Sequence, residues 1–540
     1  MEVSCDNHQY IVVFGTASLQ RYIFQSNRLK ENIGASYLAK HWLSNGLVET
    51  VEADTTDWDE YIDKPLGGRS KNQAIKLIYI GGGNAALLCK SQKVATNAVR
   101  TWSHELLKKA PELRVVVGYG KVKNFLVEAY REALKDLARC EEALPFSTPL
   151  YGLSVTRTCS TTGLPATEEV SRDEWISRTA ACKQEAVGTQ TNLGDAQKMI
   201  TKEFKQVLAP DASRALPQQC FAIELEDLGG YEGQSYIAVV HADGNRIGEK
   251  LMDVVKENTN NDEEFLGHIR EFSASVTRSS QSALKATLEY LKAALPLKSF
   301  RNPEDVFPLR PIVYGGDDLT FICDGRLGLD LAAFYLKEFA KEKIKVCGTD
   351  QSVDACAGVA IVPTKFPFIE AYNFADQLCG LAKRKRRIKG NSKGSWIDFQ
   401  IIQEGATRSI TALRKVQYRS LSGQALDDQR PYQVPEEWDD FIEILKGFQS
   451  TQWPRSRAKK LLQALVQGPA ATERFVNEIE LPKTKNTDDI AQITGWKSED
   501  DEKQSTPYFD PLNALDFYVE AKPVPLQTVS SDQTKDGDTL

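Results

Sequence analysis

The sequence has few of the features that mark a zinc ribbon, a disulfide-stabilised fold or a membrane protein. Its ten cysteines are scattered over 540 residues and never form a Cys-x-x-Cys pair, so free and mostly buried thiols are expected. No apolar run reaches membrane-spanning length. The opening MEVSCDNHQY lacks both the basic and the apolar region of a signal peptide. These absences predict a cytoplasmic protein with no membrane partner.

Net positive charge is also missing. The formal net charge is −7, which excludes binding of nucleic acid over the whole surface and leaves only a local basic patch or a partner's surface for such a contact. Cys159, Cys182 and Cys220 lie in one middle region, but their spacing is not that of a metal site. The length predicts about three or four domains.

One sequence pattern is present twice. IYIGGGNAALLC, from Ile78, aligns without gaps on IVYGGDDLTFIC, from Ile312. Each copy follows an apolar strand that begins with Tyr-Ile, namely YIVVFGTASLQ from Tyr10 and YIAVVHADGNR from Tyr236. Each copy is followed by another strand and a helix, and both helices contain EAY. The repeat predicts two α+β domains of one kind.

The repeat divides the chain into five segments. The C-terminal part contains stretches such as EEWDDFIEILKGFQ and RAKKLLQALVQG, which have helical periodicity, and the last residues are polar. We expect a first α+β domain at 8–145, a polar insert with helical patches at 146–232, a second α+β domain at 233–402, a helical domain at 403–522 and a disordered tail at 523–540.

The two copies differ in their carboxylates. On the letters Gly-Gly-Asp-Asp alone, a surface turn is the simpler interpretation. However, the first copy lacks both hairpin carboxylates and also the one on the neighbouring strand. A turn that needs only backbone freedom does not explain this joint loss, whereas a metal site that is active in one copy and lost in the other predicts it. Carboxylates on a hairpin and at the end of the adjacent strand suit divalent ions about 4 Å apart that carry a nucleoside triphosphate. In ungapped alignment, Asp243, Asp317 and Asp318 fall opposite Ala17, Gly83 and Asn84.

A basic segment, LAKRKRRIKGNSKG, ends an amphipathic helix of the second copy. One interpretation is a solvated helix end whose cations complement the helix dipole. The other is a clamp on the β- and γ-phosphates, for which Lys383 is the best candidate because it lies on the helix. We expect Lys385, Arg386 and Arg387 to attract or contact nucleic acid.

These motifs, taken in order, resemble the palm domains of the large subunit of type III CRISPR effector complexes, the CRISPR polymerase or cyclic oligoadenylate synthase. In the first copy the resemblance rests on FGTASLQRYIFQSNRLKENIGASYLAKHWL and YIGGGN. In the second it rests on HADGNRIG, YGGDDLTFIC, AGVAIVPTKFPFIEAYNFADQL and AKRKRR…KGSWIDF. Four ordered motifs are far more specific than Gly-Gly-Asp-Asp alone.

The resemblance implies an α+β fold of tandem ferredoxin-like palms of the nucleotidyl cyclase type, with an inter-palm insert and a helical C-terminal domain. It implies a nucleotidyltransferase of antiviral defence that joins ATP into cyclic oligoadenylates with Mg²⁺ or Mn²⁺. The implied partners are other subunits of a type III complex and its guide and target RNA. By position, the implied site residues are Asp243, Asp317 and Asp318 as metal ligands, the last two being catalytic, Gly315, Gly316 and Lys383 at the triphosphate, and Gly82, Gly83 and Asn84 at a second nucleotide or as scaffold.

The sequence also departs from this family. None of the five histidines is followed by aspartate, so we expect no HD-type DNA cleavage, and the cysteine-paired zinc module is expected to be absent. Gly-Asn after Asp243 replaces a second acidic residue. We expect His241 to pack beside the site or support it. Two alternatives stay open, which are a non-catalytic ATP-binding scaffold subunit and a stand-alone defence cyclase that makes another adenylated product.

Overall fold

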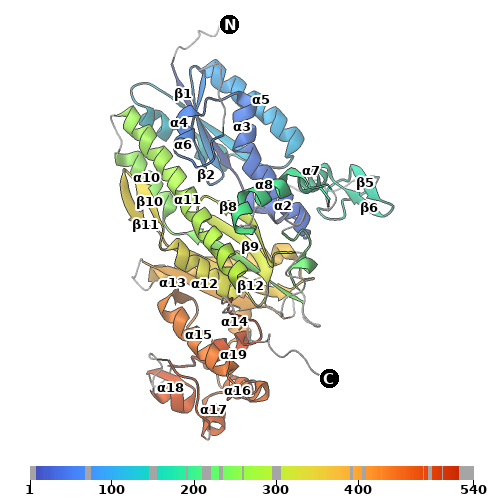
Figure 1. Ribbon diagram of the computed structural model, residues 1–540, viewed down its shortest axis with the longest axis vertical. Helices are drawn as coiled ribbons and strands as arrows, with labels where there is room; N and C mark the ends of the chain where they lie inside the picture. The colour runs from blue at the N-terminus through green and yellow to red at the C-terminus, as the bar shows by residue number, and fades with distance from the viewer. Residues whose placement is uncertain are drawn as a thin grey trace, which may run out of the picture.

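The computed structural model places its two largest β-sheets in series, with an insert beside them and a mainly helical region at the C-terminal end (Figure 1). The first sheet lies at the blue end of the view, the second in the middle, and the C-terminal region at the red end. The structure describes residues 8–66, 74–144, 155–189, 192–208, 221–229, 235–257, 261–294, 306–388, 393–403, 409–426, 429–477, 479–484, 489–500 and 503–521.

The first sheet has four antiparallel strands in the order β2-β3-β1-β4. One of its faces receives helix α6 unusually closely, because Gly118 and Gly120 of β4 carry no side chain. A Cβ at Gly120 would lie 1.8 Å from the carbonyl oxygen of Ala129 on α6. The elements are β1 (Tyr10–Thr16), α1 (Leu19–Ile23), α2 (Leu29–Trp42), α3 (Asn45–Val51), α4 (Thr56–Asp59), β2 (Ile75–Gly81), β3 (Asn84–Cys89), α5 (Gln92–Lys109), β4 (Val115–Lys121) and α6 (Leu126–Glu142).

The second sheet has six strands in the order β14-β13-β12-β7-β9-β8. Its strands β8-β9-β7-β12 repeat the order of the first sheet, so the predicted α+β fold of tandem palms is confirmed. The elements are β7 (Tyr236–Gly244), α10 (Ile247–Glu257), α11 (Asp262–Ala294), β8 (Leu309–Gly315), β9 (Asp318–Asp324), α12 (Gly328–Phe339), β10 (Lys343–Val346), β11 (Thr349–Ser352), β12 (Ala355–Pro363), α13 (Phe368–Ile388), β13 (Ser395–Ile401) and β14 (Tyr432–Val434).

Helices α12 and α13 cover opposite faces of the second sheet. Gly328 at the start of α12 packs against Ala238 of β7, whereas α13 packs against Gly358 of β12, which pairs with His241. Because side chains alternate along a strand, Ala238 and His241 point to opposite faces. The face of His241, and with it that of Asp243, therefore lies under α13.

The two palms contact each other through α11 and α2. Arg270 and Ser273 of α11 donate hydrogen bonds to the carbonyl oxygens of Ile78 and Ile80 on the edge strand β2, at 3.1 and 3.2 Å. Ser36 of α2 donates to the carbonyl oxygen of Ile312 on β8. These bonds hold the equivalent hairpins of the two palms beside each other.

The insert projects from the side of the first palm (Figure 1). Its helix α7 packs on α2, where the buried Lys183 donates to the carbonyl oxygen of Tyr22 at 2.8 Å. Cys159 and Cys182 are free thiols, and Cys220 lies outside the described residues. The elements are β5 (Glu168–Ser171), β6 (Glu174–Ile176), α7 (Arg178–Val187), α8 (Asp195–Glu203), α9 (Lys205–Leu208) and the 3-10 helix Leu225–Asp227.

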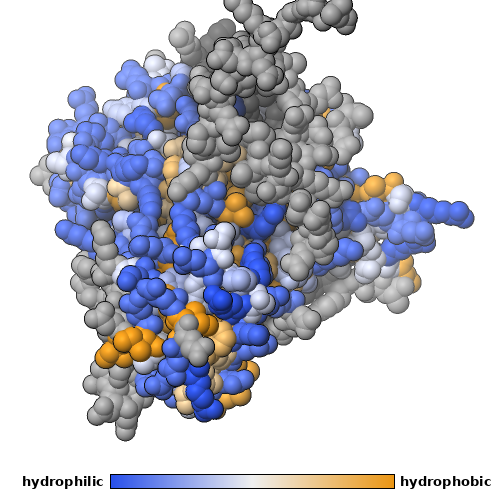
Figure 2. Space-filling view, turned by 60° about the horizontal axis from the view of Figure 1, so that its bottom comes forward, coloured by the Kyte–Doolittle hydropathy of each residue, from blue (hydrophilic) through white to orange (hydrophobic). Residues whose placement is uncertain are grey.

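The C-terminal region forms its own apolar core and is mainly helical. Three short strands in it were not predicted, and one of them, β14, extends the second sheet. The end of the molecule turned forward in Figure 2 shows apolar surface among hydrophilic side chains; Leu421, Ile490 and Ile493 of this region are exposed. The predicted tail at 523–540 lies outside the described residues. The elements are α14 (Ile410–Gln417), α15 (Glu436–Gln449), α16 (Arg455–Gln467), α17 (Pro469–Val476), α18 (Asp489–Thr494), β15 (Lys497–Asp500), β16 (Lys503–Ser505) and α19 (Phe509–Ala514).

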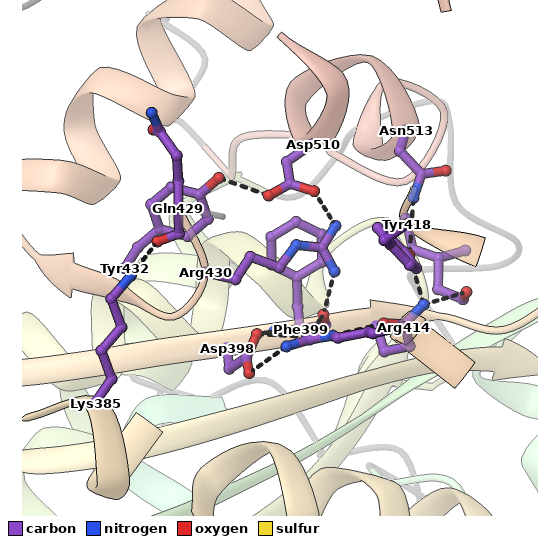
Figure 3. Close-up of polar contacts among 12 residues, drawn as sticks. Lys385, Asp398, Phe399, Arg414, Tyr418, Gln429, Arg430, Tyr432, Asp510 and Asn513 are labelled. Carbon is purple, nitrogen blue, oxygen red and sulfur yellow. Dashed lines mark hydrogen bonds and ion pairs between the residues drawn. The ribbon is translucent and has the colours of Figure 1, made fainter. Parts of the chain in front are cut away.

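A buried ionic cluster joins the C-terminal region to the second sheet (Figure 3). Arg430 is fully buried, forms an ion pair with Asp510 of α19 and donates to the carbonyl oxygen of Phe399 on β13 at 2.7 Å. Tyr432 donates to the other oxygen of Asp510 at 2.8 Å. Arg414 of α14 forms a two-pronged pair with Asp398. The cluster thus links β13, β14, α14 and α19.

Replacing Arg430 with methionine should destabilise this junction by about 3 kcal/mol, because Asp510 would stay buried without its cation. Hydrogen exchange should become faster in β14 and α19 and stay unchanged in the first palm. The matched control is the double variant Arg430→Met/Asp510→Leu, which removes both charges and should recover most of the protection. Equal loss in both variants would show that the charges themselves do not hold the junction.

No helix in the described part of the chain combines the length and apolar character needed to cross a membrane.

Candidate functional site

Two carboxylates face each other at the end of the central strands of the second palm. Strand β7 ends at Asp243 and Gly244, and β9 begins at Asp318. The antiparallel register pairs Asp243 directly with Asp318. Directly paired residues place their side chains on one face about 5 Å apart. Ile237 to Ala242 are all buried, so β7 is covered on both faces of the sheet and Asp243 lies where this buried stretch ends.

The β8–β9 hairpin brings a third carboxylate to the same place. Its two-residue turn is Gly316-Asp317, and Gly315 and Gly316 have φ of +130° and +75°, which favour glycine. Gly244 donates a backbone hydrogen bond to the carbonyl oxygen of Asp317 at 3.1 Å. A Cβ at Gly244 would lie 2.8 Å from the Cβ of Asp317. Gly244 therefore lets Asp317 approach the end of β7.

Helix α13 supplies the cation of the site. Gly358 of β12 lets the helix lie against the sheet, since a Cβ there would be 2.0 Å from the carbonyl oxygen of Ala375. Lys383 on this helix donates from Nζ to Oδ2 of Asp243. Asp376, two helical turns earlier, lies on the same side of the helix, and one of its carboxylate oxygens is 3.8 Å from Nε2 of His241.

The three carboxylates outnumber the cations beside them. Burial raises the pKa of Asp317 to about 6, and the Asp243 carboxylate adds to this rise. Burial, followed by the charges of Asp317 and Asp243, raises the pKa of Asp318 well above its usual range. Burial lowers the pKa of Lys383, but the Asp243 carboxylate more than offsets this and the net pKa is raised. The charge of Lys383 is thus paired with Asp243, and Asp317 and Asp318 have no comparable counter-charge among the groups that shift their pKa values.

These shifts predict that affinity for a divalent cation falls on acidification. Protons and the cation compete for the same oxygens. Because the pKa of Asp317 is about 6, its protonation should lower the Mn²⁺ affinity about tenfold between about pH 7.5 and pH 5.0. The raised folded-state pKa also means that the folded protein binds the proton more tightly than the unfolded chain does. The metal-free protein should therefore lose stability as the pH rises through about 6. Mn²⁺ titration and thermal unfolding over this range check both trends, and a pH-independent affinity would contradict them.

His241 lies in the same cluster. Within the part of the chain that the structure describes, one group of His, Cys, Asp and Glu side chains is close enough to hold a metal ion, and it consists of His241, Asp243 and Asp318 with ligand atoms within 4.8 Å of one another. Burial lowers the pKa of His241, and the Asp376 and Asp243 carboxylates oppose this. From its position in the sequence, His241 was expected to pack beside the site or support it, and Asp376 was not expected at the site. A histidine two residues before a site aspartate on a strand was the available signal, because such residues share a face.

The first palm keeps the hairpin without these groups. Its turn is Gly82-Gly83, with φ of +57° and +74°. Asn84 donates to the carbonyl oxygen of Gly82 at 3.1 Å, so its amide is used within the turn. The tips of the two hairpins touch, since a Cβ at Gly316 would lie 2.7 Å from the Cα of Gly82. The structure therefore brings Gly82 and Gly83 next to Gly315 and Gly316.

Strand register corrects one equivalence made from the ungapped alignment. Asn84, the counterpart of Asp318, pairs with Gly15 and not with Ala17. The second neighbouring strand agrees, because Gly118 pairs with Val13 in the first palm, and Gly118 receives α6 as Gly358 receives α13. Gly15 is thus the counterpart of Asp243. The ungapped comparison erred by two residues because it matched the strands at Tyr10 and Tyr236, whereas β7 has nine residues and β1 has seven.

The basic end of α13 is only partly available for nucleic acid. Arg386 is buried, donates to both carboxylate oxygens of Asp354 at 3.0 and 3.2 Å and donates to the carbonyl oxygen of Gly394. Lys385 donates to the carbonyl oxygen of Gln429 at 2.6 Å (Figure 3). The expectation that Arg386 contacts nucleic acid is therefore wrong, because its guanidinium is used to close the loop between α13 and β13.

A ferredoxin-like sheet with carboxylates at the end of its central strand and at the adjoining hairpin tip defines a palm domain of the nucleotidyl cyclase type. Residues 236–391 match the family of the Cas10/Cmr2 second palm domain. The match covers this segment alone, and the chain as a whole has the fold of a chain in the Csm1–Csm4 cassette. No curated protein matches the chain.

Solved structures are similar over nearly the whole chain. The crystal structure of the Csm1–Csm4 cassette in complex with cA4 contains a chain of 11% identity and TM-score 0.53, with 95% of this chain and 70% of that chain covered. The cassette in complex with pppApA gives 12% identity, TM-score 0.52 and the same coverage. The complex with pppApApA gives 12% identity and TM-score 0.50, with 96% and 71% covered. At these identities the similarity concerns the fold.

Proposed function

We propose that the chain is the large subunit of a type III CRISPR effector complex and that its second palm joins ATP molecules into cyclic oligoadenylates. The observation that carries this proposal is the pairing of Asp243 with Asp318 beside Asp317 and Lys383, inside a segment of the Cas10/Cmr2 palm family. The similar cassettes are complexes with cA4, pppApA and pppApApA, which are compounds of the class proposed here as product and intermediates. The domain division predicted from the sequence is kept as part of the proposal.

The donor set fits Mg²⁺ or Mn²⁺. Both ions prefer carboxylate oxygens, and the raised pKa values of Asp317 and Asp318 indicate carboxylates that lack a counter-charge. Asp243, Asp317 and Asp318 would hold the ions. When bound, the ions would activate a ribose hydroxyl and stabilise charge at the α-phosphate.

The chain's own groups bind and orient the nucleotide. The glycines at the hairpin tip leave backbone room for the triphosphate, and no side chain at Gly315 or Gly316 stands in its way. Lys383 pairs with Asp243. With a cation held at Asp243, Lys383 would pair less strongly with that carboxylate and would be available to donate to the β- and γ-phosphates. The first palm, whose hairpin touches the active one, serves as the wall for the second nucleotide.

Mass spectrometry of the products tests the proposal. Purified protein, alone and with its guide complex, should convert ATP with Mg²⁺ or Mn²⁺ into linear and cyclic oligoadenylates, and GTP alone and ATP–GTP mixtures report the base preference. The double variant Asp317→Ala/Asp318→Ala should form none. Equal product from that variant would rule out the second palm as the site.

The same experiment separates the alternatives. A non-catalytic scaffold would bind ATP and assemble normally but give no product with either metal. A stand-alone cyclase would be active without other subunits and would give another adenylated product. The carboxylates present in the second palm and absent from the first favour catalysis over scaffolding.

The C-terminal region is the surface that we propose for other subunits. It carries the exposed apolar side chains Leu421, Ile490 and Ile493, and the end of the molecule turned forward in Figure 2 shows apolar surface. Exposed apolar side chains gathered at one end are typical of protein contacts. The ionic cluster of Figure 3 would join such a contact to the second palm.

A further inference from the structure

His241 is a buried histidine that lies beside the carboxylates of the site. It is 2% exposed, and it lies on β7 two residues before Asp243 and on the same face. One of its ring nitrogens is within 4.8 Å of carboxylate oxygens of both Asp243 and Asp318. Three groups from two neighbouring strands therefore converge with one lone-pair atom each.

The ring is fixed in its orientation by its neighbours. Nδ1 shares a hydrogen bond of 3.1 Å with the hydroxyl oxygen of Thr320, the residue paired with His241 across β9. Tyr372 of α13 packs edge-on against the ring, with centroids 5.5 Å apart. In the tautomer in which Nδ1 donates to Thr320, the lone pair lies on Nε2, which is 3.8 Å from a carboxylate oxygen of Asp376. A histidine whose second nitrogen is anchored in this way is arranged as a metal ligand typically is.

The first palm shows the same positions without the carboxylates. By strand register, Val13 replaces His241 where Gly15 replaces Asp243 and Asn84 replaces Asp318. Val13 is as buried as His241, so the position accepts an aliphatic side chain when the cluster is absent. The imidazole is thus found in the palm that has the carboxylates and is absent from the palm that lacks them.

We propose that His241 is a direct ligand of the cation held by Asp243 and Asp318, and that this imidazole makes the site prefer Mn²⁺ or Co²⁺ to Mg²⁺. The inference rests on the metal site of the proposed function and extends it. Mg²⁺ is a hard ion that favours oxygen donors, whereas imidazole nitrogen is a good ligand for the later divalent ions. A mixed set of two carboxylates and one imidazole therefore shifts selectivity away from Mg²⁺.

Electron spin echo envelope modulation of Mn²⁺ bound to the full-length protein tests this directly. The wild-type complex should show the nitrogen coupling of a bound imidazole, and ¹⁵N-histidine labelling should change it. His241→Gln should lose the coupling, weaken Mn²⁺ about tenfold or more and leave Mg²⁺ affinity within about twofold. The control His41→Gln alters a half-buried imidazole of the first palm and should keep both the coupling and the affinity.

The outcomes separate this inference from the proposed function. If Asp318→Asn left Mn²⁺ binding unchanged, the metal site of the proposed function would be refuted. Mn²⁺ binding that needs Asp318 but shows no nitrogen coupling in the wild type would overturn the role of His241 and leave the metal site intact. This second result needs no histidine variant, so it holds even where His241→Gln folds poorly.

Discussion

If the second palm has the proposed activity, replacing Asp318 with asparagine is expected to lower oligoadenylate formation about 10³-fold or more, because the change removes a ligand of the ions that would stabilise charge at the α-phosphate. In the metal-free protein the same substitution should raise the melting temperature. The pKa of Asp318 is raised by burial and by Asp317 and Asp243, so its carboxylate costs folding free energy that the neutral amide does not. Product assays and thermal unfolding, with and without Mn²⁺, measure both effects.

The matched control for Asp318→Asn is Asp350→Asn. Asp350 is an exposed carboxylate on β11 of the same palm and pairs with Lys345. Its replacement should change activity and stability little. Mn²⁺ should stabilise the wild type and the control but not Asp318→Asn. Stabilisation of all three proteins by Mn²⁺ would place the cation elsewhere.

Replacing Gly316 with alanine is expected to lower product formation about 10²-fold without removing any charged group. The new Cβ would lie 2.7 Å from the Cα of Gly82, and residue 316 has φ +75°. The hairpin tip must therefore shift, and it takes the neighbouring Asp317 with it. A displacement of about 1 Å at a catalytic group is enough for an effect of this size.

Gly82→Ala separates the clash from backbone strain. Gly82 also has a positive φ, of +57°, but a Cβ there would meet nothing within 4 Å. This variant should fold with a small loss of stability, of about 1 kcal/mol, and should keep activity within a few fold. If both glycine variants lost activity equally, strain and not the packing of the two tips would explain the result.

Much of the fold could be predicted because the chain contains an internal repeat, so that one copy can be compared with the other. The repeat identified two palms of one kind, and apolar runs identified β7 and the two hairpins. Strand β14 could not be predicted, because three residues give no periodicity and its Tyr432 is bonded to Asp510, which lies 78 residues away along the chain. Gly15, and not Ala17, is the counterpart of Asp243. This could be recognised only from the pairing of the strands, which an ungapped alignment does not contain.

The site could be predicted in part for similar reasons. The structure places Asp243, Asp317, Asp318 and Lys383 together, as their positions relative to strand, turn and helix indicated. Asp376 was missed because its nearness to His241 depends on the close approach of α13 over Gly358. Arg386 was misjudged because its burial depends on Asp354, 32 residues away along the chain.

The most direct measurement of the central claim is anomalous scattering from crystals soaked with Mn²⁺ and a non-hydrolysable ATP analogue. Manganese is expected at Asp243 and Asp318, with a second ion about 4 Å away and with Lys383 turned from Asp243 to the β- and γ-phosphates. A structure with the nucleotide bound, no manganese at these carboxylates and Lys383 still paired with Asp243 would contradict it.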